Sequence, residues 1–352
     1  MSGMPGGVLL QLSASCWVDI GMRHGMLCAI LMFVSAAHPA TAAPQPYDPL
    51  TAPESAIVSL TFEVKDAKRD RSVPLRVYLP TANQAAPVVL FSHGLGGSRD
   101  NNPYLGNHWA KRGYVVVFVQ HPGSDETVWK GLPAAQRMTA MEHAVSLENF
   151  LARANDIPAV IDALTRWNTQ ADHPLKGRLD PNHLGMAGHS FGANTTQTVA
   201  GQAFMGDHVS FTEPRIRAAI MMSPGPPARS DPATAFASIR IPCLLMTGTR
   251  DDSPIGKTRA ADRLLVFPHL QQAPAWQVVF DQATHMAFSE NDLLGRPPKD
   301  PRYHRAILAL TTAFWDTHLR NDSAAKAWLT GKEAKSVLAP ADRWEMNALA
   351  KQ

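Results

Sequence analysis

A serine set between two glycines is the feature of this sequence that most directly suggests chemistry. Residues 188–192 read Gly-His-Ser-Phe-Gly, directly after an apolar run and before a segment of helical character. A sharp strand-to-helix turn crowds the backbone, so glycines on both sides of the serine are favoured on steric grounds. Such a turn would present the Ser190 hydroxyl at the carboxyl end of a sheet, where α/β proteins bind ligands. Ser190 is therefore a candidate nucleophile.

A serine alone is a weak nucleophile and needs a general base, an orienting acid and a site for the oxyanion. His285 follows the last strand-like run, and two acids, Asp251 and Asp252, follow the run before it. Because the carboxyl ends of parallel strands share one edge of a sheet, these side chains should meet Ser190 there. We predict Ser190 as nucleophile, His285 as base and one of the two aspartates as acid.

A glycine-rich loop, FSHGLGGSRDN at 91–101, follows the third strand-like run. Its glycines would allow the chain to fold back toward the serine. We predict that the backbone amides of Leu95 and Phe191 bind the oxyanion, the amide of Phe191 being reinforced by the positive end of its helix.

Several of these segments are similar to those of a known family. FSHGLGGSR and GHSFGA resemble motifs of the plasma-type platelet-activating-factor acetylhydrolases and related bacterial dienelactone-hydrolase-like esterases, and the likeness covers roughly residues 85–290. The order Ser, Asp, His, with each member after its own strand, is that of α/β-hydrolases. The resemblance implies an α/β-hydrolase fold, a Ser-His-Asp triad, no cofactor, and short or oxidised acyl esters as substrates.

The position of the triad acid in the chain differs from that in the animal members of that group. Those enzymes take their acid from an earlier loop, but the corresponding segment 223–231 carries no acidic residue near its strand. Asp251, three residues after Gly248, has the spacing that resembles dienelactone-hydrolase-like enzymes. Asp252, four residues after it, has that of cutinase-like polyester hydrolases. We expect Asp251 to be the acid and the other aspartate to cap the following turn or helix.

Eight short runs of strand character recur along the chain, with helical patterns between them. The inner runs are almost continuously apolar, as expected of parallel strands covered on both faces. We therefore predict one domain with a mostly parallel, eight-stranded sheet and helices on both faces. The eight runs are 57–64, 73–80, 87–93, 114–120, 183–189, 216–222, 241–247 and 276–281.

The longest stretch without a strand, from His121 to about Asn182, leaves two interpretations open. Its Met-containing segment 138–152 is either an ordinary helix packed on the sheet or part of a cap over the site, inserted within 121–156. We also expect Asp156 to cap a helix that has Pro158 in its first turn.

The first 43 residues are typical of a signal peptide preceded by an extension. A basic start at Met22 leads into an apolar run, and residues 40–42, Ala-Thr-Ala, are a small-residue pattern that a signal peptidase accepts. We expect export after cleavage near Ala42, the alternative being a disordered or packed tail. Residues 44–55 form a Pro-rich linker, and the hydrolase domain spans 56–352.

The composition excludes several other classes of function. A net charge of +3 with 33 scattered basic residues gives no reason to expect a nucleic-acid partner. The N-terminal apolar run is shorter than the roughly 20 residues of a membrane span. Cys243 would be the one cysteine left after cleavage, and no metal-binding motif occurs, so we expect no metal. That the protein needs no cofactor is what the family resemblance implies. The oligomeric state is left open.

Together these features predict an exported serine esterase that cleaves a small-molecule or lipid-like ester through an acyl-enzyme. Two alternatives stay open. The same triad could support acyl transfer or perhydrolysis, and the chain could be a non-catalytic binding protein on a hydrolase scaffold.

Overall fold

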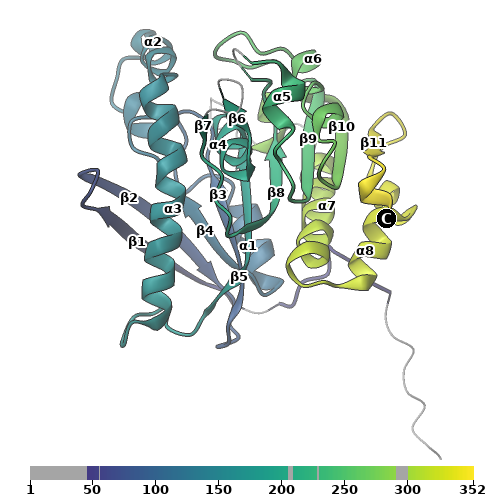
Figure 1. Ribbon diagram of the computed structural model, residues 1–352, viewed down its shortest axis with the longest axis horizontal. Helices are drawn as coiled ribbons and strands as arrows, with labels where there is room; N and C mark the ends of the chain where they lie inside the picture. The colour runs from purple at the N-terminus through teal and green to yellow at the C-terminus, as the bar shows by residue number, and fades with distance from the viewer. Residues whose placement is uncertain (1–45, 55, 205–208, 228–229, 291–299) are drawn as a thin grey trace, which may run out of the picture. The chain divides into compact units, whose positions relative to one another are not determined.

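A nine-stranded sheet runs through the protein, which a computed structural model describes for residues 46–54, 56–204, 209–227, 230–290 and 300–352 (Figure 1). The strand order is β1-β2-β4-β3-β5-β8-β9-β10-β11. The pairs β1–β2, β2–β4 and β10–β11 are antiparallel and the other five are parallel. The strands are β1 (Val58–Asp66), β2 (Arg71–Leu79), β3 (Ala86–Ser92), β4 (Val115–Val119), β5 (Leu179–His189), β8 (Ile216–Met222), β9 (Cys243–Arg250), β10 (Ala275–Thr284) and β11 (Arg343–Met346), with a separate two-stranded sheet of β6 (Ala203–Phe204) and β7 (Val209–Ser210).

Helices cover both faces of the large sheet, with α3 and α4 in front of it and α1 and α7 behind it in Figure 1. The α-helices are α1 (Pro103–Lys111), α2 (Ala134–Ala144), α3 (Leu147–Thr169), α4 (Phe191–Ala200), α5 (Pro232–Phe236), α6 (Ala260–Arg263), α7 (Arg302–Leu319) and α8 (Ser323–Thr330). Short 3₁₀ turns complete the set: η1 (Glu126–Val128), η2 (Phe267–His269), η3 (His285–Phe288), η4 (Glu333–Val337) and η5 (Leu349–Lys351).

Neighbouring residues of the inner strands enter different parts of the core. In β3, Val89 packs in the cluster that contains Trp109 of α1 and Phe314 of α7. The preceding residue, Val88, packs instead with Ile161 of α3 on the other face. Since successive side chains of a strand point to opposite faces, a strand buried on both sides must be apolar throughout. That is why these strands read as continuous apolar runs.

The predicted mostly parallel sheet of α/β-hydrolase type is confirmed, and each of the eight predicted strands is present. The sheet has one strand more than predicted. β11 is four residues long, includes Arg343 and Glu345, and pairs antiparallel with β10 at the edge of the sheet. A short edge strand with two charged residues gives almost no apolar pattern, so the sequence offered little signal for it.

The expectation that Asp156 caps a helix is wrong. The helix in question, α3, begins ten residues earlier at Leu147, where the Ser146 hydroxyl accepts the amide N–H of Asn149 at 3.1 Å. Asp156 and Pro158 therefore lie inside the helix, and the Asp156 side chain is fully buried. The segment 138–152, expected as one helix, is divided between α2 and α3.

The start of the described chain is held against α1 and α7 by a buried carboxylate. The Tyr47 hydroxyl donates to Asp316 Oδ2 at 2.8 Å, and Tyr114 donates to Asp316 Oδ1 at 2.6 Å. Arg112, which follows α1, forms an ion pair with the same carboxylate. The predicted N-terminal extension and signal peptide, residues 1–43, lie outside the described residues.

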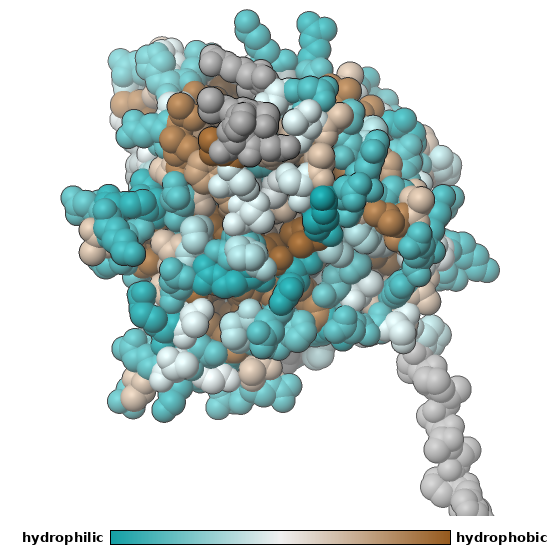
Figure 2. Space-filling view, viewed as in Figure 1, coloured by the Kyte–Doolittle hydropathy of each residue, from teal (hydrophilic) through white to brown (hydrophobic). Residues whose placement is uncertain are grey.

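The visible face of the molecule is mainly hydrophilic, and hydrophobic side chains show chiefly in the recesses between polar ones (Figure 2). A few large apolar side chains are nevertheless exposed, notably Val145 at 55%, just after α2, and Leu147 at 72%, the first residue of α3. Within the described parts of the chain, no helix has the length and apolar character needed to span a membrane.

Candidate active site

The sharp turn expected around Ser190 lies between β5 and α4. Ser190 has φ 56° and ψ −117°, a left-handed conformation that is strained for a residue with a side chain. A Cβ atom on Gly188 would lie 2.2 Å from the carbonyl oxygen of Gly192. One on Gly192 would lie 1.9 Å from the carbonyl oxygen of Ser92 at the end of β3. Neither position leaves room for a Cβ atom beside these backbone carbonyl groups, so both residues must be glycine for the turn to form.

Ser190, His285 and Asp251 lie in one chain of hydrogen bonds. His285 Nε2 is 2.8 Å from Ser190 Oγ, and His285 Nδ1 is 2.7 Å from Asp251 Oδ1. A carboxylate can only accept, so Nδ1 carries the proton and Nε2 accepts from the serine hydroxyl. Thr247 donates to the second oxygen of Asp251 at 2.8 Å. Asp251 is fully buried and His285 is 5% exposed, which protects these bonds from competing water.

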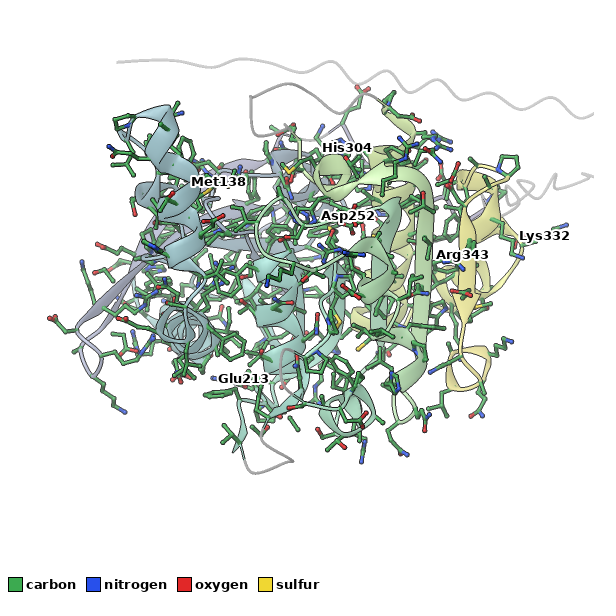
Figure 3. The ribbon with its side chains drawn as sticks, turned by 90° about the horizontal axis from the view of Figure 1, so that it is seen from above. Met138, Glu213, Asp252, His304, Lys332 and Arg343 are labelled. Atoms are coloured by element: carbon green, nitrogen blue, oxygen red, sulfur yellow. The ribbon has the colours of Figure 1, made fainter. Side chains whose placement is uncertain are left out.

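The neighbouring acid, Asp252, points away from His285. Its side chain is exposed and accepts the amide N–H of Ala260, the first residue of α6, at 2.9 Å. Figure 3 labels Asp252 in the loop that follows β9. Of the two acids that the sequence offered, the structure thus places Asp251 beside the histidine and Asp252 at the start of a helix.

An arginine that the sequence analysis did not single out lies against this pair. Arg263, at the end of α6, is 3% exposed, and its Nε atom is 3.0 Å from Asp251 Oδ1. Its Nη1 donates to the carbonyl oxygen of Ser223 at 2.7 Å, in the loop after β8. Burial lowers the pKa of Arg263 while the charge of Asp251 opposes that shift. No pattern in the surrounding sequence distinguishes this arginine from those on the surface.

The two predicted oxyanion donors border Ser190 from different elements. Phe191 is the first residue of α4, and Leu95 belongs to the loop after β3. That loop lies against the serine, because a Cβ on Gly94 would be 3.5 Å from the Ser190 Cβ. Among the residues that the structure describes, neither the Leu95 nor the Phe191 amide donates to a protein acceptor. Both N–H groups are therefore available for a ligand.

The segment 121–156, for which a cap was one of two interpretations, packs on the loop that contains Leu95. The Trp129 indole N–H donates to the carbonyl oxygen of Gly96 at 2.7 Å. The Met141 sulfur of α2 is so close that a Cβ on Gly96 would lie 2.8 Å from it. Figure 3 labels Met138 on the same helix, and its side chain is 42% exposed. A cap over a bound ligand and an ordinary packed segment both stay open as interpretations of 121–156.

A second histidine supports the backbone of His285. The Nε2–H of His189 donates a hydrogen bond to the carbonyl oxygen of His285, with 3.1 Å between the two heavy atoms. Burial holds the pKa of His189 well below its usual value, so this ring is neutral. In the described portion of the chain, no group of three or more His, Cys, Asp or Glu side chains could hold a metal ion.

Sheet order, the strained serine turn and the positions of the following loops define the α/β-hydrolase fold. Residues 76–130 match the family model described as platelet-activating factor acetylhydrolase, isoform II. This segment contains the loop of Leu95, and it agrees with the resemblance seen in the sequence.

Curated relatives of this chain include cutinases from three Thermobifida species. Cutinase cut1 of Thermobifida fusca is 24% identical over 231 residues, which cover 63% of this chain and 60% of the relative. Cutinase est1 of Thermobifida alba is 24% identical over 148 residues, covering 42% of this chain and 38% of the relative. Cutinase 2 of Thermobifida cellulosilytica is 23% identical over 175 residues, which cover 50% of this chain and 52% of the relative. The chain thus spans at most about 60% of these relatives.

The close approach at Gly192 leads to a prediction about stability. Gly192→Ala should lower the free energy of unfolding by about 3 kcal/mol, because a Cβ there overlaps a backbone carbonyl that cannot move aside cheaply. Gly94→Ala is the control, since its Cβ would meet nothing nearer than 3.5 Å. Urea denaturation followed by circular dichroism measures both. Equal stability of the two variants would contradict the explanation.

Proposed function

We propose that this protein hydrolyses carboxylic esters through an acyl-enzyme intermediate. The observation that carries the proposal is the continuous hydrogen-bond chain from Ser190 through His285 to Asp251. A hydroxyl bonded to the free nitrogen of a neutral imidazole, whose other nitrogen is held by a carboxylate, is an activated nucleophile. The cutinase names of the relatives support an ester as the substrate, and the strained turn at Ser190 supports a catalytic role for the serine.

In the proposed reaction, Ser190 Oγ attacks the acyl carbon while His285 Nε2 takes its proton. The negative charge that develops on the carbonyl oxygen is bound by the amides of Leu95 and Phe191. His285 then gives the proton to the departing alcohol, which leaves an ester on Ser190. Water repeats the sequence and releases the acid. Asp251 holds the imidazole in the required tautomer and stabilises its charged form throughout.

Arg263 adds a constraint that favours this assignment of the acid. Its Nε atom donates to the backbone carbonyl oxygen of Asp251 at 2.6 Å and lies 3.0 Å from Asp251 Oδ1, which also accepts from His285 Nδ1. The backbone of the acid and its carboxylate are thus both in contact with Arg263. His285 Nδ1 already donates to Asp251, so the Arg263 Nη2 atom 3.2 Å from it is a packing neighbour and not a donor. We infer that Arg263 positions the acid.

Ser190→Ala is the direct test of the nucleophile. The variant should fold normally and lose ester hydrolysis by about 10⁴-fold or more in kcat/KM, because the proposed acyl-enzyme forms on the Ser190 hydroxyl. Hydrolysis of 4-nitrophenyl acetate and labelling by a fluorophosphonate probe measure the loss. Ser253→Ala, which changes a serine in the loop after Asp252, is the control and should keep full activity. Near-wild-type turnover of Ser190→Ala would refute the mechanism.

The choice of acid is tested by comparing two neighbouring variants. Asp251→Asn should lower kcat by up to about 10⁴-fold, because an amide at this position favours the wrong imidazole tautomer. Asp252→Asn should leave kcat nearly unchanged and affect mainly the start of α6, to which Asp252 is bonded. Kinetics at saturating ester, with thermal unfolding as a check on folding, separate the two. The opposite ranking would make Asp252 the acid.

We further propose that the protein is exported and loses its leader. The support is the apolar run and the Ala-Thr-Ala pattern that ends at Ala42. Expression in a bacterial host followed by mass spectrometry of the exported fraction should give a mature N-terminus near Ala43. A protein that stays in the cytoplasm and begins at Met1 or Met22 would overturn this proposal.

A further inference from the structure

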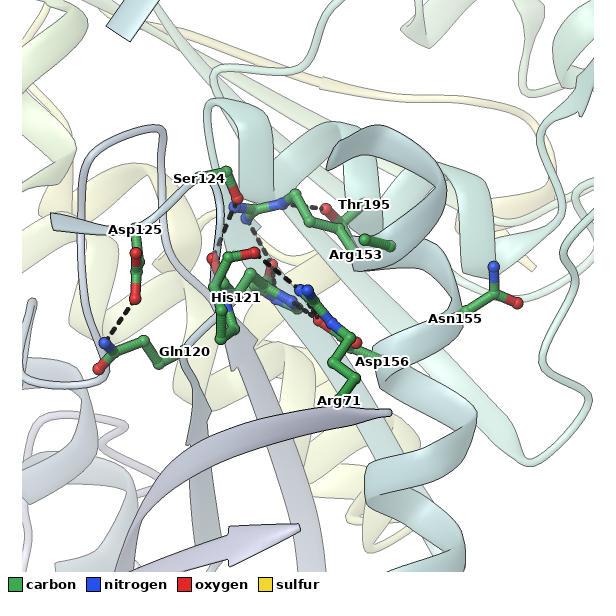
Figure 4. Close-up of polar contacts among 12 residues, drawn as sticks. Arg71, Gln120, His121, Ser124, Asp125, Arg153, Asn155, Asp156 and Thr195 are labelled. Carbon is green, nitrogen blue, oxygen red and sulfur yellow. Dashed lines mark hydrogen bonds and ion pairs between the residues drawn. The ribbon is translucent and has the colours of Figure 1, made fainter. Parts of the chain in front are cut away.

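A fully buried arginine lies beneath the loop that contains Leu95, away from the hydrogen-bond chain of Ser190. Arg153 projects from α3, and Figure 4 shows its guanidinium among side chains from several different elements. Its Nη2 atom donates to Ser92 Oγ at 2.9 Å and to the carbonyl oxygen of His93. Its Nη1 atom donates to Ser124 Oγ at 2.9 Å. These contacts fix the end of β3 and the start of the loop.

The same guanidinium also binds the helix that follows the serine. Arg153 Nε donates to Thr195 Oγ1 of α4 at 3.0 Å. The guanidinium carbon lies 4.5 Å from the centre of the Phe191 ring, which is a favourable cation–π distance. Four of the five N–H bonds of Arg153 are thus used, and they join the loop of Leu95 to the helix of Phe191.

A relay of hydrogen bonds connects this buried cation to a buried carboxylate. Asp156 Oδ2 is 2.9 Å from His121 Nδ1, and His121 Nε2 is 2.9 Å from Ser92 Oγ. Burial raises the pKa of Asp156, but hydrogen bonds from His121 and Arg71 outweigh it and hold the pKa at about 2. Burial lowers the pKa of His121 to about 4, so the ring is neutral.

The protons of the relay follow from these charges. The ionised carboxylate of Asp156 accepts a hydrogen bond from the Nδ1–H of His121, so His121 Nε2 has no proton and accepts a hydrogen bond from the Ser92 hydroxyl. The Ser92 oxygen is then free to accept from Arg153. Every polar group between the carboxylate and the guanidinium is satisfied, which is the condition under which a buried ion is tolerated. Ser92 is fully buried, and its hydroxyl connects His121 to Arg153.

The loop beyond these contacts has its peptide planes fixed as well. His121 donates its backbone N–H to His93 Nε2 at 3.0 Å, so His93 Nδ1 carries the proton and donates to the carbonyl oxygen of Gly94 at 2.6 Å. Gly97 N–H donates to the same oxygen at 3.1 Å. In a trans peptide the C=O and the following N–H point in opposite directions. Holding the Gly94 carbonyl therefore sets the direction of the Leu95 N–H.

We propose that Arg153 is the positioning residue that holds the two oxyanion donors, the amides of Leu95 and Phe191, at the separation required for catalysis. Its contacts at His93 and Ser92 set one donor, and those at Thr195 and the Phe191 ring set the other. The inference rests on the proposed function, because it concerns the oxyanion site of that reaction.

The test compares an oxygen ester with its thionoester, in which sulfur replaces the carbonyl oxygen. Sulfur is a weaker acceptor and lies farther from carbon, so a site built for an oxyanion favours the oxygen ester. We expect Arg153→Lys and Arg153→Met to lower kcat for the oxygen ester by about 10-fold to 100-fold with little change in KM. The ratio of kcat/KM for the two esters should fall by about the same factor. A loss of folded protein lowers both rates equally and leaves the ratio unchanged.

Arg112→Lys is the matched control, because it makes the same kind of substitution at an arginine whose ion pair, with Asp316 beside α1 and α7, lies outside the contacts of Arg153. That variant should keep the wild-type ratio. An unchanged ratio in folded Arg153 variants would overturn the inference, and so would a fall of equal size in Arg112→Lys. If neither Arg153 variant folds, Ser124→Ala decides: a lower ratio supports the inference and an unchanged one refutes it. Failure of the wild type to cleave either ester would instead refute the proposed function.

Discussion

The turn at Ser190 brings the backbone of α4 against the end of β3 more closely than any side chain on Gly192 would allow. This contact is backbone to backbone, so it cannot be relieved by a change of rotamer. It fixes the helix that carries the Phe191 amide against the strand that leads to Leu95. Two donors from segments about a hundred residues apart in the sequence thereby border one hydroxyl. The strain at Ser190 is tolerated because the surrounding sheet holds both elements in place.

Buried ions support this turn from two sides. On one side Arg263 lies against Asp251. On the other side Arg153 is connected to Asp156 through hydrogen bonds of Ser92 and His121. An unpaired charge would cost several kcal/mol in such surroundings, so the burial of each arginine depends on the acceptors that surround it and on the carboxylate to which it is linked. Networks of this kind permit few alternative arrangements.

Sequence patterns predicted the sheet and the loops around Ser190 because both depend on local rules. Apolar runs mark strands covered on both faces, and glycines mark places where backbones approach closely. The structure brings Ser190, Asp251 and His285 together as the order of their loops implied. The roles of Arg153 and Arg263 could not be predicted, because each contacts residues that are distant in the sequence and no sequence pattern marks such a contact. The start of α3 was misplaced because Asp156 has the residue type of a cap although tertiary ion pairs hold it within the helix.

The described chain begins near the amino-terminal ends of the parallel strands, whereas Ser190 lies at their carboxyl ends. Tyr47 binds Asp316 near the end of α7, beside Arg112 at the end of α1, whereas Ser190 follows the carboxyl end of β5. A support attached on the amino-terminal side of Tyr47 would leave the loops of the site facing the solution. Oriented immobilisation on a resin or an electrode through this end is thus compatible with access from the solution to Ser190.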